Sequence, residues 1–181
     1  MAAVMGMETE KIEEVLADIA DVSIANYNCP GQIVITGLSE AVSEASEKLK
    51  AAGGRRVITL NVSGPFHCEL LREAGEKLGE DLAEVEIQPF TIPYVTNVTA
   101  QYVTEPEQVK ELLVKQVSSS VRWQQSVETM VEDGVDTFIE LGPGRTLAGF
   151  NKKIGKAIGK ELTTYSVGTM EELEAVVAAL S

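Results

Sequence analysis

The hydrophobic pattern of residues 1–60 alternates between the period of a strand and the period of a helix. Apolar runs at 2–6, 22–28, 32–37 and 55–62 are typical of short strands. Residues 9–20 and 39–53 repeat apolar side chains every three or four positions, as amphipathic helices do, and Thr9 is the expected N-cap of the first helix. The order β-α-β-β-α-β predicts a ferredoxin-like subdomain over residues 1–60.

Beyond residue 60 the pattern predicts longer helices that alternate with short strands. We expect a helix that starts at the His67 turn, three more over 106–117, 122–134 and 145–158, and a last one over 171–180. Extended segments are expected at 85–87, 91–98, 135–141 and 163–167, with 135–141 as a buried strand. This alternation predicts an α/β domain with a largely parallel sheet over residues 61–181.

Composition and charge narrow the possible functions. Of the 181 residues, 44% are hydrophobic and 24% are charged, which is typical of a globular protein. The net charge of −13 argues against nucleic acid or a membrane surface as a partner, because binding phosphate groups requires a basic face. No apolar run is long enough to span a bilayer. Two cysteines without a CxxC spacing fit reduced thiols, and we expect a cytoplasmic location.

Two segments are candidates for chemistry. His67 is the only histidine, so it is either a general base or a residue without a chemical role. Zinc binding by Cys29, His67 and Cys68 lacks both a standard ligand spacing and a fourth ligand. The segment ELGPGRTL, residues 140–147, lacks the spacing of a phosphate-binding loop, which favours a tight strand-to-helix turn.

Four segments together resemble one enzyme family. NYNCPGQIVITG (26–37), NVSGPFHCELL (61–71), VKQV (114–117) and FIELGPGRTL (138–147) occur in the order found in malonyl-CoA:acyl-carrier-protein transacylases. In that family a ferredoxin-like subdomain is inserted into a larger α/β-hydrolase-like domain. The resemblance therefore implies that residues 61–181 are the C-terminal part of the large domain.

The resemblance also implies a reaction and its residues. Members transfer a malonyl group from coenzyme A to the pantetheine thiol of acyl carrier protein in fatty acid synthesis, through a serine ester. His67 corresponds to the general base, and the main-chain carbonyl of Gln116 corresponds to the group that orients it. Phe66 matches the residue that selects malonyl-type acyl groups. Amide side chains along the acyl-pantetheine channel match Asn26, Asn28 and Gln32. No bound cofactor or metal is implied, since the coenzyme A thioester is the substrate.

The sequence departs from the family in one respect. It contains no Gly-His-Ser-x-Gly segment, which holds the family's nucleophile. The arginine that pairs with the malonyl carboxylate also lies upstream in the family order. We therefore expect a C-terminal portion that is inactive alone and that pairs with an N-terminal segment of the same enzyme. A non-catalytic module that docks the carrier protein is the alternative, and related domains also serve polyketide pathways.

The basic side chains fall into two clusters. Lys48, Lys50, Arg55 and Arg56 lie around the end of the second predicted helix, in the small subdomain. Lys152, Lys153, Lys156 and Lys160 lie on the helix after ELGPG. Carrier proteins are acidic, and we assign the first cluster as the docking site because its subdomain would border the active-site channel.

Overall fold

The computed structural model describes all residues 1–181, which form two compact units, Met1–Ser126 and Val127–Ser181. The boundary lies within one helix, α5 (Trp123–Glu132), and each unit is described by itself. None of the helices combines the length and the apolar character that crossing a membrane requires.

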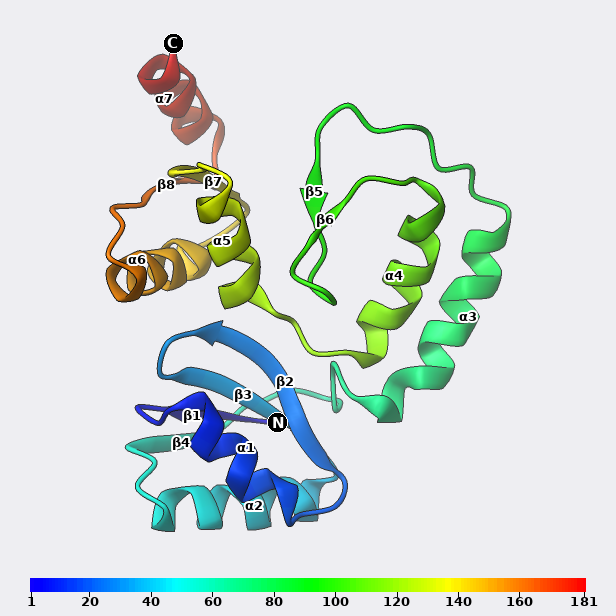
Figure 1. Cartoon of the computed structure of the whole chain (residues 1–181), viewed down its shortest axis with the longest axis vertical. Helices are drawn as coiled ribbons and strands as arrows, with labels where there is room; N and C mark the ends of the chain where they lie inside the picture. The colour runs from blue at the N-terminus through cyan, green and yellow to red at the C-terminus, as the bar shows by residue number, and fades with distance from the viewer. The chain divides into compact units, whose positions relative to one another are not determined.

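The first unit begins with a four-stranded sheet in the order β2-β3-β1-β4, and each neighbouring pair is antiparallel. Helices α1 (Thr9–Ala17) and α2 (Ser39–Ala51) lie on one face of it (Figure 1). The strands are β1 (Ala2–Met5), β2 (Val22–Cys29), β3 (Gln32–Gly37) and β4 (Arg56–Thr59). This topology confirms the ferredoxin-like prediction.

The core of this sheet lies between the strands and the two helices. Alternate residues of a strand point to opposite faces, so Ile33 and Ile35 face the helices while Val34 and Thr36 face away. The helices contribute the apolar positions that repeat every three or four residues, namely Ile12, Leu16, Val42, Ala45 and Leu49. Thr9 is not the N-cap of α1: Glu8 is, and Thr9 is the first helical residue. The apolar period does not distinguish neighbouring polar residues at a helix start.

The second half of this unit contains a helical pair. A short 3-10 turn, η1 (Glu69–Leu71), precedes α3 (Arg72–Ala83), so the helix starts later than the sequence predicts. Helix α3 packs against α4 (Glu107–Ser118). A Cβ atom at Gly75 would lie 2.8 Å from the carbonyl oxygen of Val114, so glycine is what allows this close approach.

The remaining strands of this unit form an antiparallel pair, β5 (Tyr94–Val95) and β6 (Tyr102–Val103). The hydrophobic pattern predicts a largely parallel sheet for residues 61–181 and an extended segment at 91–98, but it does not predict a strand at 102–103. Antiparallel pairing results because a parallel connection needs about a dozen residues or more, and only residues 96–101 separate the two strands. Residues 85–87, predicted as extended, belong to neither a helix nor a strand.

The outer edge of β2 is covered by residues 119–122. The amide of Tyr27 donates to the carbonyl of Val121 at 2.8 Å, and the amide of Val121 donates to the carbonyl of Ala25 at 2.7 Å. The hydroxyl of Ser120 donates to the carbonyl of Ile24 at 2.6 Å. These bonds attach the end of α4 to the ferredoxin-like sheet.

The second unit contains a two-stranded parallel sheet, as the helix–strand alternation predicts. Its strands are β7 (Thr137–Leu141) and β8 (Thr163–Val167), joined by α6 (Thr146–Ile158) and followed by α7 (Met170–Leu180). The expected burial of residues 135–141 is wrong here. Ile139 is 47% exposed and Leu141 is 76% exposed, because no element of this unit covers that face of β7.

Candidate active site

His67 lies in the turn between β4 and η1, and its backbone is unusual. Its φ is 60°, in the left-handed region that residues other than glycine rarely adopt. Such a conformation persists only where the surrounding structure enforces it, and it is frequent at functional sites. As a whole residue, His67 is half-buried.

The imidazole is held by a main-chain group of α4. Nδ1 of His67 lies 3.2 Å from the carbonyl oxygen of Gln116. Gln116 is one of the last four residues of α4, whose carbonyls have no partner within the helix, so its oxygen is available. A carbonyl can only accept a hydrogen bond, so Nδ1 must carry the proton. In the neutral imidazole the other ring nitrogen, Nε2, then carries no hydrogen and can accept a proton.

The thiol of Cys68 has hydrogen-bond partners on two sides. Sγ donates to the carbonyl of Pro65 at 3.1 Å, and the hydroxyl of Thr36 donates to Sγ at 3.9 Å. Sequence reasoning considered Cys68 only as a zinc ligand and did not single out Thr36. No group of three or more His, Cys, Asp or Glu side chains in the structure is arranged to hold a metal ion.

The three candidate amides lie on β2 and β3. Asn26 pairs in register with Val34, so its side chain shares the sheet face of Val34 and Thr36, opposite the helices. That is also the face on which Thr36 contacts Cys68. Asn28 lies where the register shifts between Tyr27 and Cys29. Gln32 begins β3, and all three amide residues are half-buried.

Phe66 directly precedes His67 and is 44% exposed. Its ring packs over Gly64, where an added Cβ would lie 3.6 Å from the ring edge. The aromatic ring therefore lies at the surface of the turn that carries the imidazole.

The first basic cluster is exposed but not wholly unpaired. Lys48 and Lys50 are in the last turn of α2, and Arg55 and Arg56 follow at the start of β4. Lys48 forms an ion pair of 2.7 Å with Glu44, and both side chains are about half exposed. Lys50 also lines a small cavity of about 290 Å³.

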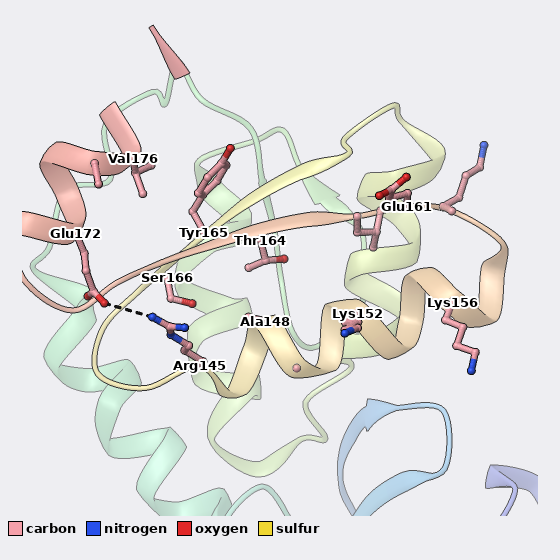
Figure 2. A pocket seen from close by; sticks show the side chains of 14 residues that line it. Arg145, Ala148, Lys152, Lys156, Glu161, Thr164, Tyr165, Ser166, Glu172 and Val176 are labelled. Atoms are coloured by element: carbon pink, nitrogen blue, oxygen red, sulfur yellow. Dashed lines mark ion pairs between the residues drawn. The ribbon is translucent and has the colours of Figure 1, made fainter. Parts of the chain in front are cut away.

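Three lysines of the second basic cluster, Lys152, Lys156 and Lys160, border a larger cavity of about 980 Å³ within the second unit, between α6, β8 and α7. Figure 2 shows Arg145 directed toward Glu172, with which it forms an ion pair of 3.6 Å. In the same view Lys156 points away from Thr164 and Ser166. Arg145 is thus paired with a carboxylate, and Lys156 is not directed at these side chains of β8.

The segment ELGPGRTL owes its shape to an internal cap. The two carboxylate oxygens of Glu140 accept hydrogen bonds from the amides of Leu147 and Ala148, each at 2.9 Å. The hydroxyl of Ser166 lies 3.5 Å from the same carboxylate. A side-chain anion therefore occupies the N-terminus of α6, where a phosphate would otherwise bind. The strand-to-helix turn favoured from the sequence is what the structure contains.

Comparison with known proteins identifies the family. The acyl transferase domain family matches residues 1–178. The chain therefore belongs to the acyl transferase domain family. Within it the chain resembles malonyl-CoA:acyl-carrier-protein transacylases, including the malonyl CoA-acyl carrier protein transacylase of Bacillus subtilis. That relative is 41% identical over 184 residues, covering 99% of this chain.

Solved structures that resemble this chain are also malonyl transacylases. An acyl carrier protein S-malonyltransferase from Vibrio cholerae is 40% identical, with a TM-score of 0.91 over 97% of this chain. A malonyl-transacylase in complex with a type II PKS acyl-carrier protein is 35% identical, with a TM-score of 0.92 over 98% of this chain. The chain spans 57% of the length of the Bacillus subtilis relative and 57% of each of these two structures.

Proposed function

We propose that this chain supplies the general base of a transacylase that moves a malonyl group from coenzyme A to the pantetheine thiol of acyl carrier protein, in fatty acid synthesis. The observation that carries the proposal is the contact of 3.2 Å between Nδ1 of His67 and the carbonyl of Gln116. It fixes the proton on Nδ1 and leaves Nε2 as the proton acceptor.

The proposed reaction has two half-reactions with the same base. Nε2 of His67 takes the proton of a serine hydroxyl as the oxygen attacks the thioester carbonyl. The imidazolium gives that proton to the departing thiolate of coenzyme A, which leaves a malonyl-serine ester. Nε2 then takes the proton of the pantetheine thiol, whose sulfur attacks the ester. Returning the proton to the serine oxygen releases malonyl-carrier protein.

The serine itself is proposed to come from a segment outside these 181 residues. The sequence has no Gly-His-Ser-x-Gly motif, and the chain matches 57% of its Bacillus subtilis relative. On this proposal the chain alone is inactive, and the segment with the serine is its first partner. The coenzyme A thioester enters as substrate, with no separate cofactor. The expected cytoplasmic location stays a prediction.

The substrate channel is proposed to pass along the sheet face that carries Asn26, with Asn28 and Gln32 near it. Amide side chains suit this role because pantetheine itself contains amide donors and acceptors. Phe66, exposed beside His67, is proposed to occupy the space that an α-methyl branch of the acyl group would need.

Substitution of the base tests the proposal. In the complete enzyme, His67→Ala should lower the transfer rate by about 10²–10⁴-fold, because the serine hydroxyl loses its proton acceptor. Steady-state transfer to carrier protein measures the effect, and circular dichroism checks that the variant is folded. A folded His67→Ala enzyme with near-normal turnover would exclude the base assignment and favour the non-catalytic docking module.

The carrier protein is proposed to dock on the first basic cluster. Because Glu44 already pairs with Lys48, the charges open to an acidic partner are mainly those of Lys50, Arg55 and Arg56. Reversal of Arg55 and Arg56 to Glu should raise the KM for carrier protein and weaken its salt dependence. Malonyl-CoA loading should not change. Equal loss of loading and transfer, or no change in either, would reject this docking site.

A further inference from the structure

The turn that carries His67 is closed by a side chain. Sγ of Cys68 donates to the carbonyl of Pro65 at 3.1 Å, so the bond spans Phe66 and His67. The carbonyl of Cys68 then accepts the amide of Leu71 at 2.9 Å, which begins η1. The left-handed residue, with φ of 60°, therefore lies inside a loop that the thiol closes.

The same thiol connects the turn to the ferredoxin-like sheet. The hydroxyl of Thr36 on β3 donates to Sγ of Cys68 at 3.9 Å. Thr36 is 0% exposed and Cys68 is 6% exposed, so water does not compete for either group. Cys68 thus acts as donor on one side and as acceptor on the other, which is the full capacity of a thiol.

His67 is consequently held from two different elements. Gln116 of α4 holds the ring through Nδ1, and β3 holds the backbone through Thr36 and Cys68. The backbone conformation sets the direction of the Cα–Cβ bond, and therefore whether the ring can reach the Gln116 carbonyl. We propose that Cys68, anchored by Thr36, is a positioning residue that fixes the tautomer and direction of the His67 imidazole.

This inference rests on the proposed role of His67 as general base, but it can be tested on the ring itself. When the thiol is removed, the turn loses the bond that encloses the left-handed residue. The residue then relaxes toward a favoured φ, and Nδ1 moves away from its acceptor. The proton is no longer confined to Nδ1, and Nε2 is protonated in part of the molecules.

The sole histidine makes the measurement direct. Long-range ¹H–¹⁵N correlation spectra of the full chain contain the imidazole signals of one residue, His67. Three variants are informative: Cys68→Ala removes the thiol, Thr36→Val removes only the anchoring hydroxyl, and Cys68→Ser retains a donor and an acceptor. Cys29→Ala is the control, since it removes the other buried thiol. Backbone amide signals of β1 to β4 report whether each variant is folded.

The wild type should show the Nδ1–H tautomer alone. Cys68→Ala should add the Nε2–H tautomer, Thr36→Val should do so to a smaller extent, and Cys68→Ser should restore the wild-type signal. If Cys68→Ala is unfolded, the tautomer observed in Thr36→Val tests the proposal instead. The proposal would be overturned if Cys68→Ala and Thr36→Val still showed the Nδ1–H tautomer alone. It would also be overturned if the wild type lacked that tautomer, or if Cys29→Ala gained the Nε2–H tautomer as well.

Kinetics of the complete enzyme separate this inference from the proposed function. Cys68→Ala should lower kcat by about tenfold or more with the KM for malonyl-CoA unchanged, because a displaced base slows chemistry without weakening binding. If His67→Ala is inactive while the tautomer in Cys68→Ala is unchanged, only the positioning role fails. If the tautomer changes but His67→Ala is active, only the base assignment fails.

Discussion

The ferredoxin-like sheet and the β7–β8 pair bury their apolar side chains to different extents. In the first, β1 to β4 pack on α1 and α2, and Ile12, Ile35 and Leu49 are each 0% exposed. In the second, the face of β7 that carries Ile139 and Leu141 is open to solvent, although parallel sheets are normally covered on both faces. The turn that carries His67 is attached to the sheet with the closed core, through the contact of Thr36 with Cys68. The turn that carries the proposed base is thus attached to the better-packed of these two regions, while the ring of His67 contacts the Gln116 carbonyl of α4.

A matched pair of substitutions measures this difference. Leu49→Ala should lower the free energy of unfolding by about 2–5 kcal/mol, because it leaves a cavity in a closed core. Leu141→Ala, the same change at a residue that is 76% exposed, should change it by less than about 0.5 kcal/mol.

Residue-resolved hydrogen exchange should show that Leu49→Ala lowers the protection of the amides in strands β1 to β4. If Leu49→Ala and Leu141→Ala lost comparable free energies of unfolding, the face of β7 that carries Leu141 would be covered in solution. The proposed difference in packing between the two regions would then be wrong.

The stability of the β7–β8 region depends more on the capping of its helix α6 than on a buried core. Glu140→Ala should lower the stability of α6 by about 1–2 kcal/mol, since the carboxylate accepts two amides at the helix N-terminus. The faster exchange of the Leu147 and Ala148 amides is the local measurement. Glu140→Gln keeps an acceptor and should lose less. The exposed carboxylate of Glu161, changed to Gln, is the matched control and should leave both amides protected.

The two regions also differ in how much the sequence predicts. The β-α-β-β-α-β order follows from periodicity, because each strand and helix has one buried face. The apolar residues of β7 by themselves predict a buried strand, and whether one face is exposed depends on which other elements lie nearby. Likewise, the glycine contact between α3 and α4 leaves no periodic signal, because Gly75 has no side chain to repeat.

The candidate site was predictable only in part. A lone histidine marks a possible base, but the partner of its ring lies 49 positions away in the sequence, and only the family resemblance pointed to Gln116. Thr36 and Cys68 are 32 positions apart, and the sequence indicates Cys68 only as a weak zinc-ligand candidate and gives no sign of a role for Thr36. Such contacts form only when distant segments pack together in the folded protein, and local sequence patterns do not predict which segments do so.

Apart from the exposed control Leu141→Ala, the smallest expected effect concerns Tyr27, on β2 of the ferredoxin-like sheet. Burial raises the pKa of its phenol above 10, and the hydrogen bond of 3.1 Å to Glu13 and the nearby negative charge add to that, while Arg122 opposes it. The folded state therefore holds this proton more tightly than the unfolded state. The contribution of protonated Tyr27 to the free energy of unfolding is complete below about pH 10, and it is lost as the pH rises through the folded-state pKa.

Tyr27→Phe should accordingly cost less than about 1 kcal/mol at neutral pH, as expected for one exposed hydrogen bond. The difference between wild type and Tyr27→Phe should shrink with rising pH above about 10. Urea unfolding of both proteins across that range measures the difference. The comparison is needed because the pKa of Tyr94 is also raised by burial and contributes equally to both curves. A difference that grows with pH would contradict the assigned environment of Tyr27.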